Sequence, residues 1–93
     1  MKTSLIHSIL FEKENPKNYK WSETKAFNWL VKHKYYPIKV SDYETNYRFR
    51  IIDPQILYNL KAEFRTIDLD INKGIKAVIA YVNPNNPIVV HFN

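Results

Sequence analysis

Hydrophobic and polar residues alternate along several stretches of the chain, and this alternation predicts β-strands. Residues 4–11 (SLIHSILF) place apolar side chains on both faces of an extended segment, as expected for a strand covered on both sides. Residues 65–71 (RTIDLDI) alternate strictly, and residues 75–82 (IKAVIAYV) follow after a short turn. Gly74, the only glycine, lies where such a turn favours a left-handed residue. We therefore predict that the last two segments pair as a hairpin.

The clearest helical pattern covers residues 22–36 (SETKAFNWLVKHKYY). Ser22 is a favourable N-cap, apolar side chains recur at helical spacing, and Pro37 ends the segment. The apolar stripe consists of Ala26, Phe27, Trp29, Leu30, Val31 and His33. Lys25 and Lys32 lie on the opposite side, so the pattern predicts an amphipathic helix with a basic outer surface.

The remaining segments complete a predicted α+β fold. Residues 38–43 and 47–52 read as a second hairpin, Asp53 and Pro54 favour a short helix or turn, and residues 88–92 read as a final edge strand. We expect a single antiparallel β-sheet of about four to six strands, with one long amphipathic helix packed across one face. That helix should pack through Trp29, Leu30 and Phe27.

Length and composition restrict the classes of function. The chain has 93 residues, which suits one α+β domain over residues 1–93. It has no cysteine, so a disulfide framework and a thiolate site are excluded. No apolar run approaches the roughly 20 residues of a membrane span, and the N-terminal segment lacks a signal-peptide core. We expect an intracellular protein that is not secreted and does not contact a membrane.

No catalytic or metal-binding pattern is present in the sequence. A single glycine excludes a Gly-rich phosphate loop, and His7, His33 and His91 lack metal-ligand spacing. Asp68 and Asp70 share a strand face and can hold Mg²⁺, but pairing with neighbouring basic residues explains them better. We therefore predict no enzymatic activity, no catalytic residues, no cofactor and no metal.

The positive charge of the chain is concentrated in one region. The net charge is +5, and residues 15–41 carry Glu23 as their only acid. A local basic region is typical of a protein that binds an anionic partner, nucleic acid first, although a solubilising surface is the alternative. The lysines of the predicted nucleic-acid site are Lys17, Lys20, Lys25, Lys32 and Lys39. Tyr35 and Tyr36 end the helix among them, where exposed aromatic rings can stack on bases.

Arg48 and Arg50 are further candidates for this site. They alternate with Tyr47 and Phe49, so the two sets lie on opposite faces of an extended strand. If the aromatic residues face the helix, each guanidinium lies on the other face and can bind a phosphate or a carboxylate. The alternative is pairing with acids of neighbouring strands, for which the candidates are Asp42, Glu44, Asp68 and Asp70.

Several of these segments together resemble a small uncharacterised domain of tailed phages and giant DNA viruses. In that domain a W-[ST]-x3-A-x2-W-L-x2-H helix precedes an R-[FY]-R strand, an acid-Pro pair and a K-G-I strand. The resemblance covers about residues 5–82 and is carried by Trp21, Ser22, Ala26, Trp29, Leu30, His33, Arg48, Phe49, Arg50, Pro54, Gly74 and Ile75. It implies a viral origin without an established activity, and a place in the host cytoplasm or nucleus or in the virion interior.

Two functional hypotheses follow from the sequence. The first is a small non-enzymatic viral accessory domain that binds nucleic acid through phosphate contacts with little sequence specificity. The alternative is a protein–protein interaction module, either a virion or capsid assembly component or an inhibitor of a host factor. In that case residues 88–92 would offer a strand edge for a viral or host protein, or for a second copy in a homo-oligomer.

Overall fold

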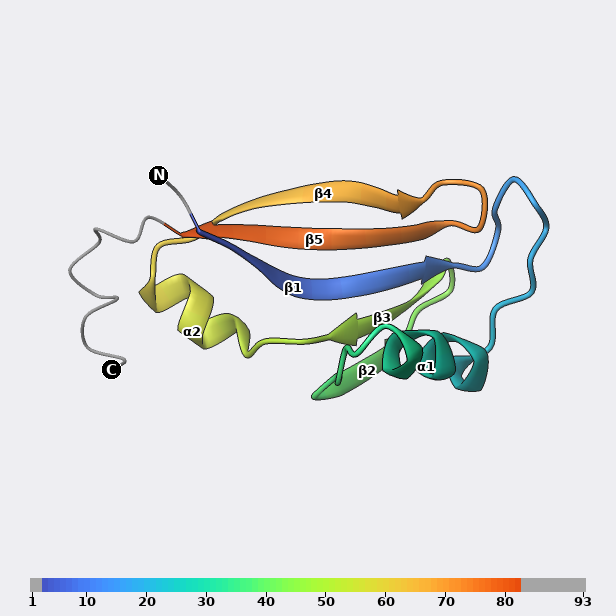
Figure 1. Cartoon of the computed structure of the whole chain (residues 1–93), viewed down its shortest axis with the longest axis horizontal. Helices are drawn as coiled ribbons and strands as arrows, with labels where there is room; N and C mark the ends of the chain where they lie inside the picture. The colour runs from blue at the N-terminus through green and yellow to red at the C-terminus, as the bar shows by residue number, and fades with distance from the viewer. Residues whose placement is uncertain (1–2, 83–93) are drawn as a thin grey trace.

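The computed structural model describes residues 3–82 and contains a five-stranded antiparallel sheet with two helices. The order of strands across the sheet is β2-β3-β1-β5-β4 (Figure 1). The strands are β1 (Thr3–Glu12), β2 (Lys39–Asp42), β3 (Asn46–Arg50), β4 (Glu63–Asp70) and β5 (Ile75–Val82), and the helices are α1 (Glu23–Lys32) and α2 (Pro54–Asn59). The predicted α+β class and antiparallel sheet are confirmed. The strand predicted at residues 88–92 lies outside the described residues.

The prediction of one long helix over residues 22–36 is wrong, because α1 has only 10 residues. Lys34 adopts a left-handed conformation, with φ of 65°. The Tyr35 N–H donates to the Leu30 carbonyl at 2.8 Å, and the Lys34 N–H donates to the Val31 carbonyl at 3.0 Å. This is the Schellman pattern that ends helices, and glycine usually occupies its left-handed position. A lysine there gives no recognisable stop signal in the sequence.

The main core lies between α1 and one face of the sheet. Its buried residues are Ile9, Phe11, Trp21, Ala26, Leu30, Phe49, Ile75, Ala77 and Ile79. Phe11 is fully buried, and three aromatic rings meet its ring edge-on. They are Trp21 at 4.7 Å, Trp29 at 5.5 Å and Phe49 at 5.6 Å between ring centroids. The strands β1 and β3 therefore meet α1 through one aromatic cluster, and β5 adds Ile75, Ala77 and Ile79 to the same core.

The residues through which α1 packs differ from those predicted. Leu30 is buried as expected, but Trp29 is only partly buried at the edge of the core. Phe27 is 46% exposed and Val31 is 40% exposed, so neither belongs to the core. The apolar stripe of α1 is wider than the surface that the sheet covers, and part of it remains open to solvent.

A second, smaller core lies on the opposite face of the sheet, beneath α2. Its buried residues are Leu57 and Leu60 at α2 and Ala80 and Val82 of β5. Ala80 and Val82 alternate with Ile79, which faces α1, so they belong to the other face. Figure 1 shows α1 beside β2 and β3, and α2 at the other end of the molecule. Each helix thus covers only part of its face.

The predicted hairpin between β4 and β5 is confirmed, including the role of Gly74. Its φ is 71°, and an added Cβ would lie 2.9 Å from the Cβ atoms of both Asn15 and Glu12. A side chain at this position is excluded both by backbone conformation and by space. The same turn anchors the loop before α1, because the Trp21 Nε1–H donates to the Lys73 carbonyl at 2.7 Å. Among residues 3–82, no helix is long and apolar enough to cross a membrane.

Candidate functional site

The candidate site is a basic patch on the sheet face opposite α1, formed by Lys39, Arg48 and Arg50. Tyr47 and Phe49 pack with the α1 core, so the alternating arginines of β3 point to the other face. Lys39 of β2 lies directly opposite Arg50 and shares its face. The three cations are called the basic sheet face below. The prediction that the arginines lie opposite the helix follows from the same alternation and agrees with the structure.

The cross-strand neighbours of these cations include no acid. Arg50 lies between Lys39 on β2 and Ser8 on β1. Arg48 lies between Ser41 and Leu10 on the same two strands. Like charges directly opposite each other destabilise a sheet, because their side chains are about 5 Å apart at the Cβ atoms. The pairing of Lys39 with Arg50 therefore costs stability unless an anion lies between them.

The two arginines lack hydrogen-bond acceptors in the part of the chain that the structure describes. Neither Arg48 nor Arg50 forms an ion pair within residues 3–82, and the Nε atom of each is buried without a hydrogen-bond partner. Leaving a buried polar donor unpaired costs about 1–3 kcal/mol, and more when the group is charged. Further along the same face, Lys76 is paired with Glu12 at 2.9 Å. Among the strand residues on this face within residues 3–82, the cations without an ion pair are thus Lys39, Arg48 and Arg50.

Each acid that the sequence offered as a partner for the arginines has a different environment. Asp42 lies opposite Tyr47 on the α1 face, where it accepts a hydrogen bond from the Lys13 Nζ at 2.6 Å. That hydrogen bond raises the pKa of Lys13. Glu44 lies in the β2–β3 turn and also raises the pKa of Lys13 by its charge.

The remaining two acids belong to β4, at the other edge of the sheet. Asp68 and Asp70 are three strand spacings from β3, which is about 14 Å. Asp70 accepts hydrogen bonds from the backbone N–H groups of Asn72 and Lys73. Pairing with neighbouring acids, the alternative reading of Arg48 and Arg50, is therefore wrong for all four candidates.

His7 lies next to the basic sheet face, at a β-bulge in β1. The register of β1 on β5 shifts between Ile6 and Ser8, so His7 is the extra residue of the bulge. Its ring is buried, lies edge-on to Phe64 at 5.6 Å, and has Nδ1 3.0 Å from the Ser8 Oγ. Burial lowers the pKa of His7, and the charges of Arg48 and Arg50 lower it further. The pKa of the His7 imidazole therefore depends on the charges of Arg48 and Arg50.

We expect the stability of the protein to decrease as the pH falls below about 6.5, the ordinary histidine pKa. Since the folded-state pKa of His7 is lowered, the unfolded chain takes up a proton first, and stability is lost until the pH reaches the lowered value. Urea unfolding at pH 7.5 and pH 5.5 measures this change. The variant His7→Gln should lose most of the pH dependence, and His33→Gln, at the exposed C-cap of α1, should keep it. If the free energy of unfolding changed by the same amount between pH 7.5 and pH 5.5 in wild type and in His7→Gln, this assignment would be contradicted.

The other predicted binding residues do not join the basic sheet face. Lys25 and Lys32 belong to α1, on the other side of the sheet, and the Lys25 Nζ lies 5.5 Å above the Tyr19 ring. Lys17 and Lys20 are exposed in the loop before α1. Tyr35 is half-buried and stacks with Trp29 at 6.4 Å, whereas Tyr36 is 67% exposed. The nine predicted residues therefore divide between two surfaces.

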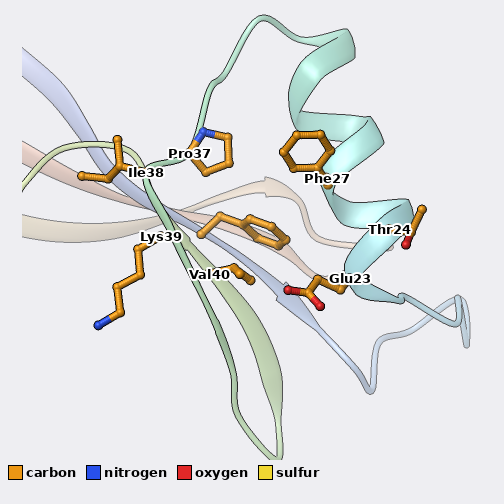
Figure 2. Close-up of a pocket in the computed structure, with 8 residues that line it drawn as sticks. Glu23, Thr24, Phe27, Pro37, Ile38, Lys39 and Val40 are labelled. Atoms are coloured by element: carbon orange, nitrogen blue, oxygen red, sulfur yellow. The ribbon is translucent and has the colours of Figure 1, made fainter.

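A second feature was not predicted from the sequence: an apolar cleft between α1 and the edge strand β2. It has a volume of about 420 Å³ and is lined by Glu23, Thr24, Phe27, Pro37, Ile38, Lys39, Val40 and Phe49. Figure 2 shows Phe27 and Glu23 projecting from α1 towards the wall that carries Val40 and Pro37, whereas Lys39 points away from the helix. The exposed face of α1 and the edge of the sheet thus form one apolar surface, called the α1–β2 cleft below.

Comparison with family models, with curated proteins and with solved structures finds no match for this chain. The resemblance to a viral domain therefore stays a prediction. Within residues 3–82, no group of three or more histidine, aspartate or glutamate side chains is arranged to hold a metal ion. Two surfaces of the described residues can bind a partner: the basic sheet face and the α1–β2 cleft.

Proposed function

We propose that this protein binds nucleic acid through phosphate contacts, with little sequence specificity, and that the basic sheet face is the primary contact surface. The observation that carries the proposal concerns Arg48 and Arg50, whose buried Nε atoms have no hydrogen-bond partner within residues 3–82. Arg50 lies opposite Lys39, and the described cross-strand neighbours of both arginines include no acid. A phosphate offers the oxygens that arginine donors lack here, and arginine binds phosphate with two parallel hydrogen bonds.

The spacing of the three cations also suits a polyanion. Arg48 and Arg50 are two residues apart on β3, which is about 6.6–6.8 Å, and Lys39 is one strand away, at about 5 Å. Several such contacts release counterions from the phosphate backbone, and this release makes affinity depend on salt and little on base sequence. Lys25, Lys32, Lys17 and Lys20 contribute long-range attraction from the other surface.

The proposed role is that of a non-enzymatic accessory domain of a virus, acting in the host cytoplasm or nucleus or in the virion. The viral assignment rests on the sequence resemblance, and the binding mode rests on the basic sheet face. Protein binding is the second candidate function, and the α1–β2 cleft beside an edge strand supports it.

Titrations with single-stranded and duplex DNA and RNA over a series of salt concentrations test the nucleic-acid proposal. We expect Arg48→Ala/Arg50→Ala to lower the slope of log affinity against log salt by about 1.8 on duplex or about 1.4 on single strands, since each lost contact contributes about 0.9 or 0.7. Lys25→Ala/Lys32→Ala removes the same number of charges from α1 and is the matched control. It should change the slope much less.

A second measurement locates the bound phosphate. Because the arginine charges lower the pKa of His7, phosphates bound to them should raise that pKa towards its ordinary value, which an NMR titration of the His7 ring detects. Two results would exclude the proposal: wild-type binding weaker than about 100 μM near physiological salt, or a loss of slope in the α1 variant but not in the arginine variant.

A further inference from the structure

The strand β2 lies at an edge of the sheet and directs backbone groups outward. The Tyr43 N–H donates to the Asn46 carbonyl at 2.9 Å, so Tyr43 belongs to the residues that pair with β3. Hydrogen bonding alternates along an antiparallel strand, so Ser41 also points its backbone groups to β3, whereas Val40 and Asp42 point theirs away from it. No strand among residues 3–82 pairs with the outward N–H and C=O groups of Val40 and Asp42, so an added strand can use them.

The face of β2 towards α1 would receive large apolar side chains from such a strand. Val40 lines the α1–β2 cleft across from Glu23 of α1, and Phe27 lines it across from Pro37 (Figure 2). Val40 is 40% exposed, Phe27 is 46% exposed and Ile38 is 62% exposed, which leaves apolar surface on both walls and at one end. A residue paired with Val40 would place its side chain in this cleft, because directly opposed residues of neighbouring strands share a face.

The other face of β2 would receive acidic side chains. Successive residues of a strand point to opposite faces, so the neighbour of the residue in the cleft lies beside Lys39. Lys39 faces Arg50 in the next strand, and no acid neutralises this pair within the described residues. A second copy of this chain would bring another Lys39 and Arg50 to the same face if the two β2 edges paired symmetrically. Charge complementarity therefore favours an acidic partner over self-association.

We propose that the free edge of β2 binds an extended peptide of a partner protein in which large apolar residues alternate with acidic residues. The backbone of the peptide pairs with Val40 and Asp42, its apolar side chains enter the α1–β2 cleft, and its acids lie over Lys39. This is strand addition, in which backbone hydrogen bonds supply affinity and alternate side chains supply specificity. The inference goes beyond nucleic-acid binding, because it uses the edge of β2 and the α1–β2 cleft and shares only Lys39 with the basic sheet face.

The peptide DFDIDFD, acetylated and amidated, is a direct probe for this site. Its control is DDFFIDD, which has the same composition without the alternation. We expect the wild-type protein to bind DFDIDFD at least about tenfold more tightly than DDFFIDD in fluorescence anisotropy. Val40→Pro removes one outward N–H without removing a bond to β3, and should weaken binding about tenfold, whereas Val40→Thr keeps that N–H and most of the affinity.

A charge variant tests the second face of the strand. Lys39→Glu should weaken binding of DFDIDFD about tenfold at low salt, and Lys61→Glu, an exposed charge change after α2, should not. Val40→Pro should retain nucleic-acid affinity, which separates this site from the basic sheet face. Equal affinity for the two peptides, or unchanged affinity in Val40→Pro, would overturn the proposal. So would a wild-type dimer, seen by sedimentation, that Val40→Pro dissociates, since a second copy would then occupy the edge.

Discussion

Replacing Phe11 with alanine should destabilise the protein by about 3–5 kcal/mol, the usual cost of removing a fully buried phenylalanine ring. Phe11 has no exposed surface, and three aromatic rings from α1, β3 and the loop before α1 contact it edge-on. The alanine variant loses the transfer free energy of the ring, leaves a cavity, and loses aromatic contacts worth about 0.5–1.5 kcal/mol per pair. Equilibrium unfolding in urea measures the change.

Phe27→Ala is the matched control for this prediction. Both substitutions remove a phenylalanine ring, but Phe27 is 46% exposed and lines the α1–β2 cleft. Its loss should cost less than about 1 kcal/mol, since partly solvated side chains contribute little cavity energy. Similar costs for the two variants would contradict the assignment of the core to the cluster around Phe11. Trp29→Ala should fall between them, because Trp29 is only partly buried.

Replacing Leu57 with alanine should cost about 2–5 kcal/mol, although α2 has only six residues. Leu57 is fully buried, and it packs in the second core on the face opposite α1. A helix this short is not stable by itself, so its docking depends on the few apolar side chains that it buries. Hydrogen exchange of the α2 amides, measured beside urea unfolding, should show that this end of the molecule opens more readily in the variant.

Ile56→Ala controls for changes in helix propensity, because Ile56 precedes Leu57 in α2 but is 39% exposed. It should change the free energy of unfolding by less than about 1 kcal/mol. The costs of Phe11→Ala and Leu57→Ala should add to within about 0.5 kcal/mol in the double variant, since the two residues belong to separate cores. Strong coupling between them would show that the two cores are one.

The two candidate surfaces differ in how far the sequence could predict them. The arginines of β3 were identified from their alternation with aromatic residues, and the face they occupy follows from that alternation. The absence of a neighbouring acid did not follow, because it depends on the order of strands across the sheet. No pattern in the sequence predicted the α1–β2 cleft. Phe27 and Val31 read as core residues, and only the limited area of the sheet beneath α1 leaves them exposed.

Features that depend on residues close together in the sequence could be predicted from the sequence alone. The hydroxyl of Ser22 accepts a hydrogen bond from the Lys25 N–H at 3.1 Å, and the carboxylate of Asp53 accepts one from the Gln55 N–H at 2.9 Å, so both helices begin where their N-caps lie. The β4–β5 hairpin likewise forms around Gly74, whose conformation is accessible without tertiary contacts. These interactions join residues at most a few positions apart, and a sequence pattern of that length can specify them.

Features that depend on residues far apart in the sequence were determined only by the tertiary structure. The strand β1 pairs with β3 on one side and β5 on the other, which separates the arginines of β3 from the acids of β4. Lys34 takes its left-handed conformation while Tyr35 packs against Trp29, so contacts with the core accompany the early end of α1. The same packing divides the lysines and arginines between two surfaces. Local propensity cannot choose among such arrangements, because their free energies depend on which strands pair and which side chains become buried together.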